Sequence, residues 1–167
     1  MSDDFLRKGR LIYYQDDIEE IDRLLGEFLK LSNSKGAFLV DKEGHLVTQK
    51  GMSDSINGDN LSALVAGSFA ATKEIARMIG ESEFSFILHQ GKRDHIQFSR
   101  VSDRAILAIV FDDRTTTGMV TLYSAELATK IEKIFDISSR KVRLKSEQIE
   151  SNFTDSVKDK LDDLFKG

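Results

Sequence analysis

The feature that most constrains the fold of this chain is an apolar run at residues 104–111, where Arg104 is followed by seven apolar side chains ending at Phe111. A strand with one solvated face alternates apolar and polar residues, whereas a strand covered on both faces does not. The run therefore predicts a central strand of a sheet, with the other elements packed around it.

Two shorter strand-like runs occupy residues 37–41 and 45–49. Lys42, Glu43 and Gly44 connect them, which is a connection length typical of a tight hairpin. The sequence predicts an antiparallel pair here.

A second pair of strand-like runs precedes the central strand. If Leu88 faces Ile96, as matching of the apolar faces suggests, His89 lies opposite His95 on the polar face. No third ligand shares that face, and zinc takes at least three protein ligands, so a plain polar face is favoured over a metal site. The alternating apolar residues are Phe84, Phe86 and Leu88 on the first run and Ile96 and Phe98 on the second.

Three stretches have the apolar spacing of amphipathic helices: residues 15–31, residues 58–80 and residues 120–136, the last ending near Asp136. The predicted order is helix, two strands, helix, three strands, helix. This order indicates the α/β class, as an α+β sandwich in which helices flank a mixed or antiparallel five-stranded sheet.

The central helical stretch has clear start and stop signals. Asn57 or Asp59 can cap its first turn, and Gly80 can end it. Its large side chains suit a packed core; they are Leu61, Leu64, Val65, Ile75 and Ile79.

A stripe of small side chains runs along the same helix at three- and four-residue spacing; it consists of Ala63, Ala66, Gly67, Ala70 and Ala71. A glycine inside a helix costs about 1 kcal/mol relative to alanine, so Gly67 suggests a packing reason. Two interpretations remain open: the stripe lies on the chain's own sheet, or it meets another helix or another protein.

The composition bounds the function. The 167 residues carry a formal net charge of −4, which gives no electrostatic footprint for nucleic acid. The chain has no Cys, which fits a reducing compartment, and no signal-peptide or membrane-inserting stretch is recognisable. We expect a cytoplasmic domain over residues 14–137, preceded by an arm at residues 1–13.

The tail at residues 138–167 is predicted to be a charged linker followed by a short amphipathic helix. Four apolar residues share one face of that helix: Val157, Leu161, Leu164 and Phe165. About three turns do not persist alone in water, so this face is expected to lie in the groove of a partner.

Motifs for catalysis are absent from the sequence. It contains no phosphate-binding loop, nucleophile elbow, zinc-protease motif or dinucleotide fingerprint. Asp112 and Asp113 precede a helical stretch, where carboxylates serve as caps and turn residues. We therefore expect neither enzymatic activity nor a cofactor or metal.

The chain resembles the roadblock/dynein light chain family over residues 14–135, and in particular its bacterial members that regulate Ras-like GTPases. The resemblance is carried by these segments: Phe38-Leu39-Val40-Asp41-Lys42-x-Gly44, Leu64-x-Ala66-Gly67-x-x-Ala70-Ala71, Ile79-Gly80-Glu81-x-Glu83-Phe84, His89-x-Gly91, Phe111-Asp112-x-Arg114-x-x-x-Gly118 and Leu161-Asp162-Asp163-Leu164-Phe165.

The resemblance implies a homodimer in which the third strands of two copies join their sheets and the central helices form a platform. It further implies that this platform activates a small Ras-like GTPase of the MglA type in bacterial cell polarity or gliding motility, with a location at a cell pole, and without an arginine finger. The GTPase or dimer interface is expected at the small stripe with Glu74, and the tail helix is expected to contact the GTPase separately. A non-catalytic scaffold and a small-molecule sensor of the same fold are the alternatives.

Overall fold

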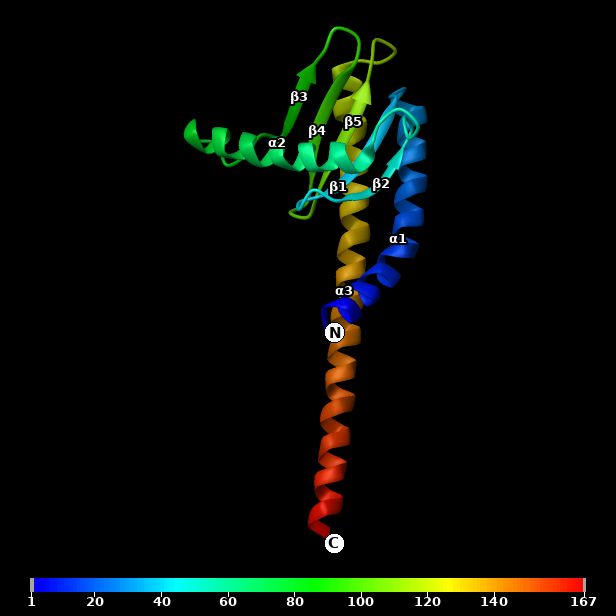
Figure 1. Cartoon of the computed structure of the whole chain (residues 1–167), viewed down its shortest axis with the longest axis vertical. Coiled ribbons are helices and arrows are strands. Elements are labelled where there is room, and N and C mark those ends of the chain that lie inside the picture. Colours follow the sequence, from blue (N-terminus) through cyan, green and yellow to red (C-terminus); the bar gives the residue numbers. More distant parts are fainter. Residues whose placement is uncertain (1, 167) are drawn as a thin grey trace. The chain divides into compact units, whose positions relative to one another are not determined.

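A computed structural model describes the backbone of residues 2–166 and the side chains of residues 15–166. The described residues form three helices and five strands (Figure 1). In chain order these are α1 (Ser2–Ser32), β1 (Gly36–Asp41), β2 (Leu46–Lys50), α2 (Gly58–Met78), β3 (Phe86–Gln90), β4 (His95–Val101), β5 (Ala105–Phe111) and α3 (Thr117–Lys166). The predicted element order and fold class are confirmed.

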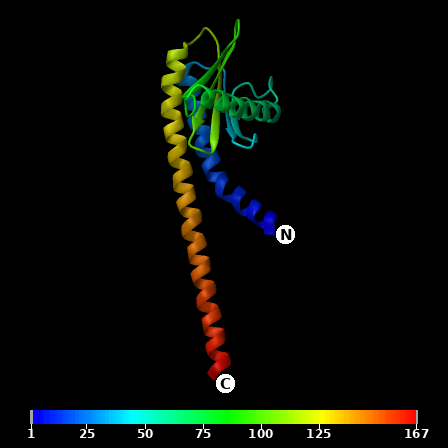
Figure 2. The same cartoon turned by 90° about the vertical axis from the view of Figure 1, so that its left-hand side faces the viewer.

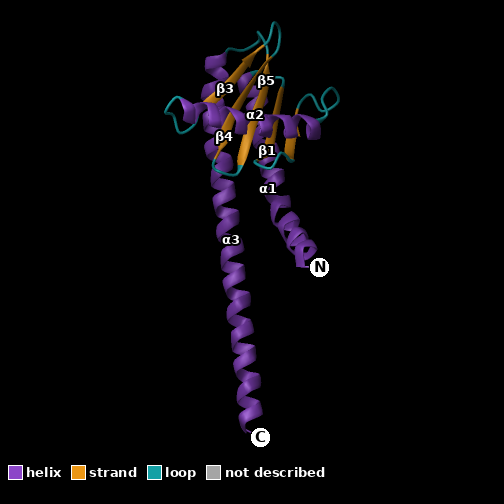
Figure 3. Cartoon of the chain, turned by 60° about the vertical axis from the view of Figure 1, so that its left-hand side comes forward, coloured by secondary structure: helices purple, strands orange, loops and turns teal. Residues whose placement is uncertain are grey.

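The sheet is antiparallel throughout, with the strand order β2-β1-β5-β4-β3 (Figure 3). Every residue of β5 is buried, as the unbroken apolar run predicted. Strands β2 and β3 lie at the two edges, and their outer backbone groups have no strand beside them in the described chain.

Helices cover both faces of the sheet. Helix α2 crosses one face, and α1 and the first turns of α3 lie on the other (Figure 2). Side chains on alternate strand positions enter the two layers: Phe38, Val40 and Val110 join the cluster under α2. On the opposite face, Thr121 of α3 donates a hydrogen bond to the buried Gln97 of β4 over 3.1 Å.

The chain divides into two compact units, residues 1–132 and residues 133–167. The first unit contains the sheet, α1, α2 and the beginning of α3. The second unit consists of the remainder of α3, described separately below.

The predicted register of β3 on β4 is wrong by one residue. His89 pairs with Ile96 and Gln90 with His95, so the two histidines are not opposite each other. Because helices cover both faces of the sheet, β3 carries apolar side chains on both sides. Phe86 and Ile87 were therefore equally good candidates to face Phe98, and it is Ile87 that does so.

Two predicted helix boundaries are also wrong. The backbone of residues 2–13, expected to form a loosely attached arm, belongs to α1, and Met1 lies outside the described residues. Helix α3 does not end near Asp136 but continues through the expected linker to Lys166. Residues 119–166 contain neither Gly nor Pro, so nothing in that sequence stops the helix. The division into arm, domain and tail as functional parts stays a prediction.

The ends of α2 form as expected. The side chain of Asn57 accepts a hydrogen bond from the backbone N–H of Asn60 over 3.1 Å. Gly80 adopts a φ of 84° just past the helix, and its N–H donates to the carbonyl of Arg77. A left-handed residue at this position closes the helix, and glycine adopts that conformation without steric cost.

The burial of β5 gives a direct stability prediction. Leu107→Ala should lower the free energy of unfolding by about 2–5 kcal/mol, because the side chain is fully buried and leaves a cavity. Leu122→Ala on an exposed face of α3 is the matched control and should change it by less than about 0.5 kcal/mol. Urea denaturation of both variants measures the difference; equal losses would contradict the assigned core.

Candidate functional site

The candidate site is the face of α2 that points away from the sheet. The inward face packs Leu61, Val65 and Phe69 against the sheet. Its fully buried members are Gly58, Ser62, Val65 and Ala76. The predicted stripe lies largely on the opposite side of the helix. Ala63, Gly67, Ala70, Ala71 and Glu74 are exposed or partly exposed, and Ala66 is half-buried.

Gly67 has open space around it. A methyl group built on its Cα meets no atom within 4 Å, so the chain's own packing does not require a glycine there. This excludes the interpretation that the stripe as a whole lies on the chain's own sheet. What covers the stripe stays a prediction.

Four large apolar residues of α2 and its C-terminal cap are also exposed, which the sequence did not predict. Leu64 is 72% exposed, Ile75 54%, Met78 86% and Ile79 67%. Leu64, Ile75 and Ile79 were expected in the core, and that assignment is wrong. The inward face is centred on Val65 and Ala76, so these larger side chains lie on the flank and outer side of the helix. The number of large apolar residues in α2 is the signal that could have revealed this exposure, since one face of a helix cannot bury them all.

Three of these exposed apolar residues, Ile75, Met78 and Ile79, lie at the C-terminal end of α2, whereas Leu64 lies near its start. The C-terminal end of α2 extends past β3, the edge strand (Figure 1). On β3 itself, Phe86 is 40% exposed. Exposed apolar clusters and open strand edges are the two features through which chains associate. We name the set of Ile75, Met78, Ile79 and Phe86 the apolar flank.

Asp112 and Arg114 form a local pair at the entry to α3. The Arg114 side chain and backbone both donate to Asp112 Oδ1, over 2.9 and 3.1 Å, and these hydrogen bonds lower the pKa of the Asp112 carboxyl. Thr116 caps α3 by accepting from the N–H of Met119 over 3.2 Å. The turn-and-cap interpretation of this segment is confirmed.

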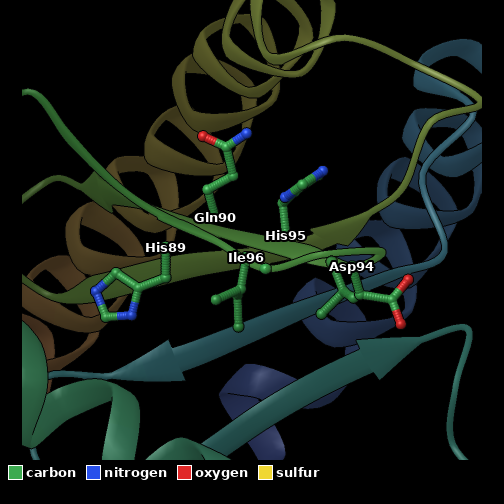
Figure 4. Close-up of a pocket in the computed structure, with 7 residues that line it drawn as sticks. His89, Gln90, Asp94, His95 and Ile96 are labelled. Atoms are coloured by element: carbon green, nitrogen blue, oxygen red, sulfur yellow. The ribbon is translucent and has the colours of Figure 1, made fainter.

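A hollow of about 340 Å³ lies at the turn between β3 and β4. Figure 4 shows that Gln90 and His95 point to one side of the hairpin, whereas His89 and Ile96 point to the other. The polar groups therefore do not converge on a common point, as recognition of a small ligand requires. The hollow gives no support to a small-molecule sensor.

One cluster in the described residues has the composition of a metal site: Asp41, Glu43 and His45 in the β1–β2 turn place one possible ligand atom each within 4.8 Å of one another. The Asp41 carboxylate already accepts hydrogen bonds from the backbone N–H groups of Glu43 and His45, both over 2.9 Å. An Asp in this role is an ordinary turn-forming residue. The turn accounts for the cluster, and we assign no metal to it.

The predicted partner contacts of the tail lie in the second unit. Val157, Leu161, Leu164 and Phe165 are 40, 47, 78 and 87% exposed on the continuous helix α3.

Among the described residues, no helix is both long enough and apolar enough to cross a bilayer.

The sequence matches the Roadblock/LC7 domain over residues 20–111, more than half of the chain. The chain therefore belongs to the Roadblock/LC7 family. The matched segment begins within α1 and ends with β5, so it includes the whole sheet and α2.

Within that family, the chain is similar to MglB of Myxococcus xanthus, with 34% identity and a TM-score of 0.71 over 75% of this chain and 94% of that chain. The gliding protein MglB of Thermus thermophilus is 29% identical with a TM-score of 0.64, over 70% of this chain and 88% of that chain. An uncharacterised protein of Methanocaldococcus jannaschii is 25% identical over 115 residues, which are 69% of this chain and 99% of that protein.

The exposure of Gly67 predicts an unusual response to substitution. Gly67→Ala should raise the free energy of unfolding by about 0.5–1 kcal/mol, because alanine favours the helix and meets no neighbour. Gly44→Ala should lower it by about 1 kcal/mol or more, since Gly44 has a φ of 93°. Urea denaturation tests both; a loss of stability in Gly67→Ala would mean that another surface already covers the stripe.

Proposed function

We propose that this protein is a homodimeric regulator, not itself an enzyme, that activates a small Ras-like GTPase of the MglA type in bacterial cell polarity or gliding motility. The observation that carries the proposal is the 34% identity to MglB over nearly the whole of that chain. The exposed stripe on α2 supplies the surface that such a function needs.

Dimer formation is proposed from two surfaces left open in the first unit. Pairing of β3 with β3 of a second copy would satisfy the backbone groups of the edge and extend the sheet. The same pairing would bring the apolar flanks of the two copies together. Burial of a large apolar side chain contributes about 1.5–3 kcal/mol, so the four on each copy are enough to favour association.

The stripe is the proposed docking platform for the GTPase. Small side chains allow a partner's backbone to approach closely, and at the end of the stripe Glu74 forms an ion pair with Arg77 over 2.9 Å. On α2, Ile75 and Ile79 lie beside the stripe and Met78 lies in line with it, so we propose that one helix serves the second copy and the GTPase together.

Activation is proposed to occur by shifting the GTPase toward its own catalytic arrangement. A regulator that binds the hydrolysis-competent conformation more tightly raises the population of that conformation. Arg114, the arginine of the family-like segment after β5, is already bound to Asp112 within its own turn. We do not assign it the role of an arginine finger.

The decisive experiment is a multiple-turnover GTP hydrolysis assay with the MglA-type GTPase of the same genome, together with co-purification of that GTPase loaded with GTP or GDP. Stimulated hydrolysis and preferential binding of the GTP form are expected. Binding without stimulation would instead identify a non-catalytic scaffold, and the absence of binding would overturn the proposal.

The stripe gives the first prediction of this model. Gly67→Arg should weaken GTPase binding by more than about tenfold, because the long cation clashes with the docked surface or must be desolvated. The matched control is Gly26→Arg on α1, where an added Cβ also meets no atom within 4 Å. Titration of each variant against the GTPase measures the affinities; equal weakening by both would remove the stripe from the interface.

The tail gives the second prediction. Leu161→Asp combined with Phe165→Asp should leave the dimer formed through β3 intact but weaken the GTPase complex by roughly tenfold to a hundredfold, as expected for losing two exposed apolar contacts. Nucleotide release from the GTPase should change more than hydrolysis, because the platform is untouched. Leu144→Asp, elsewhere on the same helix, is the control. Unchanged affinity and release would exclude the tail as a GTPase contact.

A further inference from the structure

The second unit has a charge pattern that its proposed GTPase contact does not explain. Residues 140–145 carry four cations and no anion, namely Arg140, Lys141, Arg143 and Lys145. Residues 147–163 carry six anions and only two cations; the anions are Glu147, Glu150, Asp155, Asp159, Asp162 and Asp163. The helix is therefore basic in its first part and acidic in its second.

An apolar stripe joins the two charged parts. Val142, Ile149, Phe153, Val157 and Leu161 follow one another at steps of seven, four, four and four residues and so share one side of the helix. They are 48, 62, 70, 40 and 47% exposed. A helix whose apolar stripe is open along about five turns is a typical element of a helix pair.

We propose that this segment pairs antiparallel with the same segment of a second copy of the chain. Parallel pairing would place the basic part against the basic part and the acidic part against the acidic part, which is repulsive. Antiparallel pairing brings basic against acidic twice in one interface. The charge pattern therefore favours the same segment of a second copy as the partner, and it favours the antiparallel orientation.

The charged parts fit a crossing point between Ile149 and Glu150, where Ile149 of one copy lies opposite Glu150 of the other. In this arrangement residues 140–145 of one copy lie beside residues 154–159 of the other, which carry two anions, Asp155 and Asp159, and one cation, Lys158. The same arrangement places Val142 beside Val157 and Phe153 beside Ser146. A large side chain opposite a small one packs at constant distance between helix axes.

This pairing rests on the second unit alone and does not depend on the proposed GTPase function. It adds a consequence if that function holds. Val157 and Leu161 belong both to the pairing stripe and to the proposed GTPase contact, so the two associations compete for the same residues.

Cysteine cross-linking of the full chain tests the proposal, because the natural sequence contains no Cys. Three variants are compared under mild oxidation without any GTPase: Val142→Cys, Val157→Cys and the two combined. Positions 142 and 157 are about 22 Å apart along one helix, so they cannot cross-link within a chain. Antiparallel pairing predicts covalent dimers at least about tenfold faster in the combined variant than in either single one.

The other outcomes overturn the proposal. Rapid cross-linking of each single variant would show parallel pairing, and slow cross-linking in all three would show no pairing. Adding Ile149→Asp to the combined variant should abolish the fast cross-linking while circular dichroism confirms that the helix is retained. Fast cross-linking in this variant would exclude the apolar stripe as the pairing surface.

Charge reversal tests what sets the direction. In the combined variant, Arg140→Glu with Arg143→Glu should slow cross-linking by about tenfold, and adding Asp155→Lys with Asp159→Lys should restore it. Equal cross-linking rates with the natural charges, with the two Arg→Glu changes and with all four changes would contradict the electrostatic basis of the pairing.

Discussion

The first unit depends on the burial of β5 on both faces. A strand of seven apolar residues at the centre of an antiparallel sheet has no solvated side, so helices must cover it twice. Helix α2 alone covers one face, whereas α1 and the first turns of α3 share the other. Since α2 is the only helix in its layer within the described residues, its outer side around Gly67 is open, and only the β1–β2 turn lies against the stripe, at Ala63 and Ala66. The exposed stripe is thus a direct consequence of how the core is closed.

The same layer explains why the apolar flank exists. Helix α2 is longer than its footprint on the strands, and its end passes the edge strand β3. Ile75, Met78 and Ile79 lie in this part of the helix and remain exposed, and β3 is an edge strand. A second copy would cover both features in one step, because extension of the sheet moves the two flanks toward each other. The single chain leaves uncovered what a symmetric pair can bury.

The sequence predicted the structure correctly where a local pattern is compatible with a single local structure. The unbroken apolar run ending at Phe111 predicted a central strand, and Asn57 and Gly80 are strong signals for the ends of α2. The prediction failed where the outcome depended on tertiary packing. Apolar residues on both sides of β3 left its register undetermined, and Leu64 and Val65 are both apolar although only Val65 is buried. The orientation of a helix about its axis is decided by its neighbours, which the sequence of that helix does not contain.

The tail shows a different error: the sequence was divided into a linker and a separate short helix, whereas the backbone forms one continuous helix. The basic cluster at residues 140–145 suggested a solvated linker, yet Arg and Lys are good helix formers and no Gly or Pro follows until residue 167. A free three-turn helix would have to nucleate by itself, whereas a continuation of α3 only propagates from turns that already exist. The apolar side chains from Val142 to Leu161 are therefore held in one line before any partner binds. Because their positions are already fixed, association loses less conformational entropy than coupled folding would, and even a narrow stripe of five side chains can support specific pairing.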